Sequence, residues 1–514
     1  MGSISNNQKH VVVHAFAFAW GHNKPLCAFV TRILEAQPET VVTYLTGSHL
    51  YSKIIAELKR LPSDQYEALE SRLNVIDISE PTSDNDMMKP LDLFAPTFTA
   101  LYTSASVTCN TSGKTISGLS CPTLAIIDPF TAYAYEAIRA VSGESVPILA
   151  WWTANAGSLL RVFGPPHLGG VVVPELETPE GRAETKKRIF AGENIQWHEL
   201  VGNIVNIPGI DTSYDYEWFP QKTALTQLSA LVEKMGSIYI READGIICVS
   251  ANAYEPEAIA KAEEWYTSMN KVWYTIGPLS MEAKPPQTSA SESDPVVEAF
   301  LNRIHKEFGS KSLLYISFGT VFWPEMSDRI WAVIEGLIEK RQPFLFSHSS
   351  AFQQFPEERK KQIADCGIAM ELPWVPQERI LSHPVTGWFC THGGWNSMQE
   401  AFLYRVPQIF WPFQADQPYN ALRMTHIKAG FELVEVRTGV DGTRIPYKCK
   451  ELPAFTDASC KAEIEDLVDR LRGNEGFIVR ENFEAMADEI GQAWNMKDGS
   501  SRKDLNHLLD KFLA

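Results

Sequence analysis

The chain has 514 residues, more than one hydrophobic core usually organises, so two domains of about 200 to 250 residues each are expected. It is 45% hydrophobic and 21% charged, which is typical of a globular protein. Its formal net charge of -17 argues against nucleic acid as a partner, because binding to a phosphate backbone depends on Lys and Arg. An anionic ligand would have to be held by local geometry.

The eight cysteines are scattered without a C-x-x-C pair, so neither a zinc cluster nor a disulfide framework is indicated. The first residues lack the features of a secretory signal, and no run of about 18 apolar residues could span a membrane. Asn6 stands where a myristoylation signal after Gly2 would need Ser or Thr. We therefore expect a cytoplasmic protein with no integral membrane segment.

From His10 onward, short apolar runs alternate with helix-length amphipathic segments, which is typical of parallel sheets covered by helices. The expected strands of the first part are residues 10–20, 40–46, 74–79, 123–128, 146–153 and 245–250. The expected helices between them are residues 25–35, 48–61, 91–109 and 131–141. This pattern predicts one doubly wound α/β domain over residues 1–270.

Residues 277–295 contain four prolines and almost no bulky apolar side chains, so an exposed linker is predicted over residues 271–294. The alternation then restarts, and a second α/β domain is predicted over residues 295–489. Its expected elements are strands at 312–318, 343–348, 386–390, 407–411 and 431–436 and a helix at 326–341. A last helix, 503–513, is expected within residues 490–514. Two such domains facing each other form a cleft for two substrates, since open α/β sheets bind ligands beyond their strands' carboxyl ends.

The stretch from Trp374 to Gln417 combines several chemical signals. Residues 386–392 end a strand, Gly393-Gly394 predicts a turn, and residues 395–404 have the composition of a helix. A glycine turn that opens a helix exposes backbone N–H groups and the positive end of the helix dipole, which form an anion site without net positive charge. Three side chains at that helix start can donate further hydrogen bonds to a pyrophosphate: His392, Asn396 and Ser397.

Glu400 lies one helical turn beyond Asn396, where its carboxylate can accept hydrogen bonds from two vicinal hydroxyls such as those of a ribose. Asp416 and Gln417 can do the same for a hexose, and Trp374 offers a flat face for a base. Taken singly, a Gly-Gly turn before a helix is usually only a turn, and a lone Trp or His usually packs. The ordered series over 44 residues is not expected by chance.

Residues 374–417, WVPQERILSHPVTGWFCTHGGWNSMQEAFLYRVPQIFWPFQADQ, closely resemble the donor-binding box of the plant-type UDP-glycosyltransferases. That family is inverting, accepts small molecules and has the GT-B fold of two Rossmann-like doubly wound parallel-sheet domains facing a cleft. The resemblance implies UDP-glucose as co-substrate, because a final Gln tends to accompany glucose, and it implies no cofactor and no metal. The donor-binding residues implied are Trp374, Val375, Gln377, His392, Gly394, Trp395, Asn396, Ser397, Glu400, Asp416, Gln417, Thr320 and Thr153.

The resemblance also implies a role for each part of this set. Trp374 would stack on uracil, and Gln377 and Glu400 would bind the ribose. The pyrophosphate would be held by His392, Asn396 and Ser397, with a further phosphate contact from Thr320. The sugar would meet Trp395, Asp416, Gln417 and Thr153.

The chain departs from the family at Arg405, where a Gly usually precedes Val-Pro. A residue at that helix end often needs positive φ, which costs a non-glycine side chain about 1 kcal/mol. A different local loop is therefore an open alternative.

Transfer of a sugar to an alcohol requires removal of the hydroxyl proton, and histidine is best suited to this near neutral pH. His22 follows the first predicted strand and Asp128 ends the fourth. Because parallel strands end on the same rim, contact between the two side chains is expected. Both positions match the family's catalytic His and its Asp partner. The implied mechanism is a single displacement that yields a β-glycoside, with His22 as base and helix-terminus donors stabilising the departing UDP.

Aromatic residues cluster near His22, and most of them are expected in the core. The candidates for an acceptor pocket are Phe18, Trp20, Phe94, Phe98 and Trp151. They predict a flat, apolar acceptor such as a phenolic, polyketide or terpenoid alcohol. A monomer is expected. Two alternatives stay open: a UDP-sugar epimerase or hydrolase on the same fold, and a catalytically silent UDP-sugar binding protein.

Two other motifs are set aside. Asp84-Asn85-Asp86 has the form of a metal-binding D-x-D, but it lies in a polar stretch before Pro90 rather than after a buried strand. Gly113-Lys114-Thr115 suggests a P-loop, yet Thr108 stands where that motif needs Gly.

Overall fold

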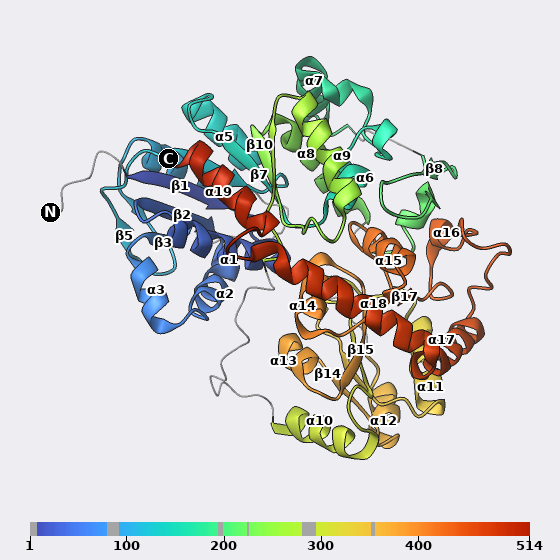
Figure 1. The fold of residues 1–514 in the computed structure, drawn as a ribbon. Helices are drawn as coiled ribbons and strands as arrows, with labels where there is room; N and C mark the ends of the chain where they lie inside the picture. Colours follow the sequence, from blue (N-terminus) through green and yellow to red (C-terminus); the bar gives the residue numbers. More distant parts are fainter. Residues whose placement is uncertain (1–7, 80–91, 194–198, 224–225, 280–294, 351–354) are drawn as a thin grey trace.

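The protein folds into two α/β halves, each built around a parallel sheet (Figure 1). The computed structural model describes residues 8–79, 92–193, 199–223, 226–279, 295–350 and 355–514. Residues 8–279 are called the first half, and residues 295–491 the second half. Most of the predicted linker, 280–294, and the Asp84–Asp86 motif lie outside the described residues.

The first sheet has seven parallel strands in the order β11-β10-β7-β6-β1-β2-β3. They are β1 Lys9–His14, β2 Thr40–Thr46, β3 Leu73–Asp77, β6 Leu124–Ile127, β7 Ile148–Trp152, β10 Gly245–Cys248 and β11 Val272–Thr275. Every residue of β2, β6, β7 and β10 is buried. This explains why these strands appear in the sequence as continuous apolar runs, since helices cover both faces of the sheet.

Nine helices surround this sheet in the described part of the first half. They are α1 Trp20–Ala36, α2 Ser48–Leu58, α3 Ser63–Glu70, α4 Phe94–Tyr102, α5 Ala132–Ser142, α6 Ala156–Phe163, α7 Pro179–Phe190, α8 Thr226–Glu242 and α9 Pro256–Ser268. Short elements add β4 Val107–Thr108, β5 Thr115–Ile116, β8 Ile204–Val205, β9 Ser213–Tyr214, η1 Pro166–Leu168, η2 Pro174–Glu177 and η3 Asp215–Trp218. Helix α1 buries Leu26, Val30 and Ile33 completely, the spacing of one helical face turned to a core.

The second sheet has six parallel strands in the order β14-β13-β12-β15-β16-β17. They are β12 Leu313–Ser317, β13 Phe344–Ser347, β14 Ala369–Leu372, β15 Thr386–Thr391, β16 Gln408–Phe410 and β17 Gly430–Glu432. Its helices are α10 Pro295–Phe308, α11 Ser327–Glu339, α12 Glu357–Asp365, α13 Gln377–Ser382, α14 Trp395–Tyr404, α15 Gln417–His426, α16 Gly439–Gly442, α17 Asp457–Arg472 and α18 Asn474–Gly491.

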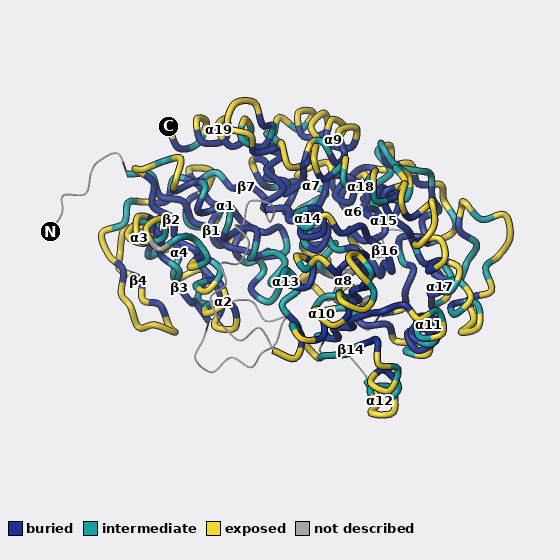
Figure 2. Tube along the Cα trace, turned by 60° about the horizontal axis from the view of Figure 1, so that its bottom comes forward, coloured by how far each residue is buried: buried dark blue, intermediate teal, exposed yellow. Residues whose placement is uncertain are grey.

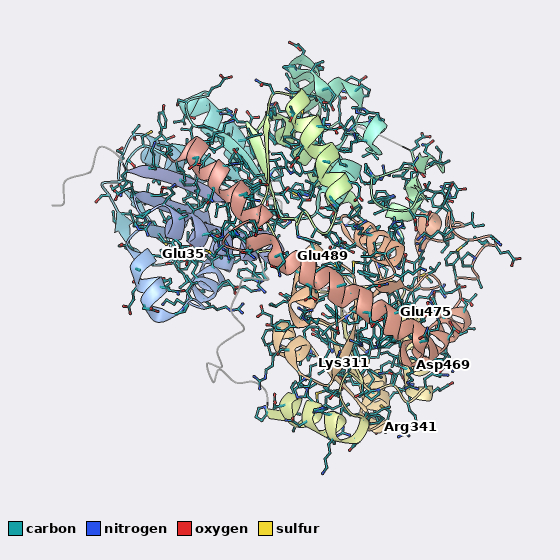
Figure 3. All side chains as sticks on the ribbon, in the orientation of Figure 1. Glu35, Lys311, Arg341, Asp469, Glu475 and Glu489 are labelled. Carbon is teal, nitrogen blue, oxygen red and sulfur yellow. The ribbon has the colours of Figure 1, made fainter. Side chains whose placement is uncertain are left out.

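The end of the chain returns to the first half. Glu475 and Glu489, labelled in Figure 3, lie near the two ends of α18. After η5 Gln492–Trp494, helix α19 Ser500–Phe512 packs against β11. There Asp504 Oδ2 accepts a hydrogen bond from the Thr275 N–H at 2.7 Å, and the Trp494 indole donates to Pro278 O at 2.9 Å. The chain end is therefore fastened to the edge strand of the first sheet.

The structure differs from the predicted elements in several places. Residues 10–20 are not one strand, because the chain leaves the sheet after His14 and α1 begins at Trp20. Residues 272–275, which were predicted to belong to the linker, form β11. A strand of four residues just before Gly277-Pro278 is too short to be recognised from its sequence pattern. Within the predicted helix at 91–109, α4 ends at Tyr102 and β4 follows, and residue 91 lies outside the described residues.

The two halves share a buried interface. The Trp395 ring lies 4.8 Å from the Tyr254 ring of the first half, and Arg437 pairs with Glu217 at 3.4 Å. Figure 2 shows buried chain around α14, between the halves, whereas α12 and β4 lie at exposed edges. None of the helices that the structure describes combines the length and the apolar composition that a membrane crossing requires.

Candidate active site

The predicted catalytic pair and several predicted donor residues lie at the switch point of each sheet, the place where the strand order reverses. In the first sheet this point lies between β1 and β6, which are followed by His22 and Asp128. In the second sheet it lies between β12 and β15, which are followed by Thr320 and His392. Ligands of open α/β sheets bind at such points. Asn396 Nδ2 of α14 reaches Gly21 O of α1 at 2.8 Å, so the two switch points adjoin each other.

His22 and Asp128 form a direct hydrogen bond. His22 Nδ1 lies 2.6 Å from Asp128 Oδ2. Asp128 is fully buried and also accepts the backbone N–H groups of Phe16 at 3.1 Å and Phe130 at 3.0 Å. These bonds fix the carboxylate, so the neutral ring donates from Nδ1 and keeps Nε2 as its acceptor nitrogen. The His22 side chain is 24% exposed, which leaves part of the ring accessible.

The titratable groups here differ in basicity. Burial favours the neutral form of His22, but the charge and hydrogen bond of Asp128 and the charge of Asp416 outweigh it and raise its pKa above the ordinary value. Burial lowers the pKa of His392 to about 4, so this ring is neutral near pH 7. Burial raises the pKa of Asp416 to about 6. His22 is therefore the better proton acceptor of the two histidines.

A proline explains how α1 meets the second half. Helix α1 contains Pro25, whose missing N–H would otherwise bond to the carbonyl of Gly21, four residues earlier. That carbonyl instead accepts the 2.8 Å bond from Asn396 Nδ2. The helix that carries His22 is thus tied to the first turn of α14, and Asn396 keeps a second amide hydrogen for a ligand.

The turn before α14 has the conformation that an anion site needs. Gly393 has φ 84°, and a Cβ there would come within 2.8 Å of the Phe410 ring, so only glycine fits. Gly394 is the N-cap and has no side chain to close the helix end. The carboxylate of Asp416 accepts the Trp395 N–H at 2.7 Å and so engages one donor of this end. A bound phosphate would therefore share the helix start with Asp416, a contact that the sequence did not predict.

The predicted ribose-binding residues lie together. Gln377 Nε2 donates to Glu400 Oε2 at 2.7 Å and lies 3.4 Å from Ser397 Oγ. Trp374, just before α13, is 67% exposed, as a stacking platform for a base would be. The Val375 side chain is buried in the core, so it does not face a ligand.

Two residues predicted to contact the sugar, Trp395 and Gln417, already make side-chain contacts within the protein. The Trp395 side chain is 2% exposed, and its indole N–H donates to Val249 O of the first half, so it packs between the halves. Only its backbone N–H lies at the helix end. Gln417 Oε1 accepts the N–H groups of Phe413 at 2.8 Å and Gln414 at 3.3 Å, so this oxygen holds the loop. The Trp395 contact joins residues 146 positions apart, so spacing in the sequence does not reveal it.

The two remaining donor residues lie after strands. Thr153 follows β7, whose neighbour in the sheet is β6, and is 7% exposed. Thr320 is exposed and follows Gly319, whose φ is 73° and where a Cβ would lie 3.2 Å from the His392 ring. Both therefore lie on the carboxyl rims that meet between the halves.

Three of the predicted acceptor-pocket residues are core residues. Phe94, Phe98 and Trp151 are 1%, 0% and 0% exposed. Trp151 stacks on Phe29 with ring centroids 5.3 Å apart and donates its indole N–H to His22 O at 3.0 Å. Trp151 is therefore a buried residue of the strand that stabilises the start of α1, and it is not accessible to an acceptor.

Four other aromatic rings near His22 are only partly buried, and two of them, Phe18 and Trp20, were predicted as pocket residues. Phe16 and Phe130 lie 6.3 and 5.5 Å from the His22 ring, centroid to centroid, and each is half-buried. Phe18 is half-buried and meets the His49 ring edge to face at 4.7 Å, while Trp20 lies under Lys53 Nζ at 4.6 Å. Phe130 was not predicted as a pocket residue, although it follows Asp128-Pro129 directly.

Arg405 keeps the helix end that a glycine would form. It lies in the left-handed region, with φ 56° and ψ 42°, as the C-cap of α14. Its guanidinium pairs with Asp488 of α18 and donates to Glu484 O at 3.4 Å. The loop is thus retained despite the substitution.

Solved structures of similar shape identify the fold. A UGT transferase from Siraitia grosvenorii in complex with UDP matches with a TM-score of 0.69 at 19% identity, over 98% of this chain and 100% of the other. UGT71G1 of Medicago truncatula, complexed with UDP-glucose, matches with a TM-score of 0.68 at 19% identity, over 99% of both chains. The fold is the GT-B fold, with two Rossmann-like domains facing each other.

Proteins of similar sequence are UDP-glycosyltransferases. Residues 252–441 match the family described as UDP-glucoronosyl and UDP-glucosyl transferase. The UDP-glycosyltransferase eriJ of Hericium erinaceus is 27% identical over 98% of this chain and 99% of its own length. The anthocyanidin 3-O-glucosyltransferase UFGT of Vitis vinifera is 25% identical over 99% of this chain and 98% of its own. The chain is thus similar to family 1 UDP-glycosyltransferases over nearly its whole length, and these matches support a glycosyltransferase enzyme.

Proposed function

We propose that the enzyme transfers glucose from UDP-glucose to a hydroxyl group of a small lipophilic acceptor, a phenolic, polyketide or terpenoid alcohol, and forms a β-glucoside. The observation that carries this proposal is the 2.6 Å contact between His22 and Asp128 beside the start of α14. The names of relatives support the sugar and the acceptor class, since UFGT is an anthocyanidin glucosyltransferase. The half-buried rings of Phe16 and Phe130 beside His22 favour a flat acceptor.

The first half would bind the acceptor and the second half the donor. In the second half, Trp374 would stack on uracil, and Gln377 and Glu400 would bind the ribose. The pyrophosphate would lie at the start of α14, where Asn396 and His392 donate hydrogen bonds and backbone N–H groups point outward. UDP-glucose is a co-substrate in this scheme, and no cofactor takes part.

The chemistry would be one displacement. Nε2 of His22 takes the proton of the acceptor hydroxyl as its oxygen attacks the anomeric carbon. The bond from that carbon to the UDP oxygen breaks, and its electron pair leaves with UDP. Asp128 stabilises the imidazolium, and the donors at the start of α14 stabilise the charge on the departing diphosphate. Attack from the opposite side turns an α-linked donor into a β-glucoside.

Two other functions make different predictions. An epimerase or hydrolase would consume UDP-glucose without any acceptor. A silent binding protein would bind UDP and turn over nothing. The fixed hydrogen bond from Nδ1 of His22 favours a working base, because it leaves Nε2 free to accept a proton.

The test compares the wild-type enzyme, His22→Ala and Glu400→Ala. Each is incubated with UDP-glucose and a panel of phenols and terpenols, with products followed by mass spectrometry and UDP binding by calorimetry. His22→Ala should lose about 10²- to 10⁴-fold in transfer rate, the usual contribution of a general base, while its UDP affinity is retained. Glu400→Ala should weaken UDP binding itself. A wild type that binds UDP but transfers no sugar, or a fully active His22→Ala, would contradict the proposal.

A further inference from the structure

A cluster of charged side chains joins the two halves beside the proposed ribose subsite. Lys24 of α1 lies with its Nζ 2.6 Å from Glu400 Oε1 and 2.7 Å from Glu378 Oε1. Arg60, which follows α2, donates to both oxygens of Glu378, at 3.1 and 2.7 Å. The side chains of Lys24, Glu378 and Glu400 are 11%, 15% and 8% exposed. None of these contacts follows from spacing, since the partners are more than 300 residues apart.

Lys24 determines how Glu400 is presented. One oxygen of Glu400 faces Lys24 Nζ, and the other accepts from Gln377 Nε2 at 2.7 Å. The carboxylate is therefore held from both sides. Each of its oxygens keeps a further lone pair, enough to accept two vicinal hydroxyls. The ammonium has three donors, of which two engage Glu378 and Glu400, so the third can reach a ribose oxygen.

Lys24 also balances charge at a place where an anion would bind. Glu378 and Glu400 lie beside the proposed site of a negatively charged diphosphate, on a protein of net charge -17. Burial opposes the charged form of Lys24, but the charges of Glu400 and Glu378 outweigh it and hold its pKa above the ordinary value. Burial likewise opposes the charge of Glu378, yet Lys24 and Arg60 lower its pKa to about 2. The ammonium thus stays charged beside Glu400 at neutral pH.

We propose that Lys24 is a positioning residue of the donor site, which holds Glu400 for the 2′- and 3′-hydroxyls of the nucleotide ribose. Recognition of the ribose by the second half would then depend on α1, the helix that also carries His22. This inference rests on the proposed function. If Lys24 only joined the two halves, its loss would change the affinity for every nucleotide alike. The proposed role predicts a loss of affinity only for nucleotides with ribose hydroxyls.

The experiment measures the affinity of the full-length protein for UDP and for 2′,3′-dideoxy-UDP by calorimetry. The wild type should prefer UDP by about tenfold or more, since hydrogen bonds to a charged group are lost with the hydroxyls. In Lys24→Met the preference should fall to about threefold or less, because Glu400 is no longer held. If Lys24→Met does not fold, Lys24→Gln serves to measure the same ratio of affinities for the two nucleotides. Lys24→Arg should retain most of the preference for UDP.

Arg60→Met is the matched control. It removes a cation from the same cluster that contacts Glu378 but makes no hydrogen bond to Glu400 in the described structure, so the preference for UDP should stay at the wild-type value. The role of Lys24 would be overturned if both Lys24→Met and Lys24→Gln kept the wild-type preference for UDP, or if their affinity fell equally for both nucleotides. Either result would leave the proposed function unaffected. A wild type that fails to bind UDP would overturn the proposed function together with this inference.

Discussion

At the scale of the residue, the behaviour of His22 depends on what surrounds its ring. Desolvation alone would make the imidazole a weaker base, as happens for His392, where burial lowers the pKa to about 4. His22 differs because Asp128 contacts it and Asp416 lies near enough to act through its charge. In the proposed mechanism the two histidines therefore serve different purposes, His392 as a neutral hydrogen-bond donor and His22 as the base.

The Asp128 contact predicts a shift in the pH profile. His22 must be neutral to accept a proton, so the wild-type kcat/KM should fall as the pH drops through the raised pKa of this ring. Asp128→Asn removes the charge that raises it, so the acid limb should move to lower pH. The rate should also fall at every pH, because the ring loses its orienting carboxylate. The measurement is kcat/KM against pH for both proteins, and an unmoved acid limb would show that Asp128 does not set the basicity of His22.

At the scale of the element, helix α14 connects the proposed donor site to the rest of the molecule. Its start presents backbone N–H groups after Gly393, and its first turn reaches α1 through Asn396. Its end is formed by Arg405, whose backbone lies in the left-handed region, a conformation that costs a non-glycine residue conformational energy. The guanidinium contact with Asp488 fastens this end to α18, so the strained residue also joins two helices.

Replacing Arg405 by Gly and by Ala separates the strain from the contact. Both variants lose the guanidinium and its half-exposed pair with Asp488, worth less than about 1 kcal/mol. Only Arg405→Gly releases the left-handed strain, so it should be more stable than Arg405→Ala by about 1 kcal/mol. The free energy of unfolding in urea gives the comparison. Equal stability of the two variants would mean that the helix end carries no strain.

At the scale of the whole molecule, the halves are joined by buried polar contacts as well as by apolar packing. The Arg437 side chain is 6% exposed and pairs with Glu432 of the second half at 2.7 Å and with Glu217 of the first at 3.4 Å. Lys24 joins the halves near the proposed ribose subsite. Because so many partners lie in opposite halves, we expect the two halves to unfold together.

Arg437→Met should destabilise the protein by about 3 kcal/mol, because it leaves the buried Glu217 and the partly buried Glu432 without their cation. Lys360→Met is the control, since Lys360 pairs with an exposed Glu357 and its loss should cost less than about 1 kcal/mol. Urea unfolding monitored by tryptophan fluorescence measures both. If Arg437→Met is no less stable than the control, the buried pairs do not hold the halves together.

Much of this architecture could be predicted from the sequence. The expected strand at 40–46 is β2 and the expected helix at 395–404 is α14, since apolar runs and glycine turns are local signals. The contact of His22 with Asp128 was also expected, because parallel strands end on one rim.

Only the tertiary structure decided which faces meet. The sequence could not show that the Trp395 indole donates to Val249, that Asp416 accepts the Trp395 N–H or that Trp151 is fully buried. It also could not pair Lys24 with Glu400, which are 376 residues apart. Local patterns determine elements and turns, because a few neighbouring residues set the backbone. The direction of a side chain at an interface depends on the burial and charge of partners far along the chain, which are defined only once the two halves pack.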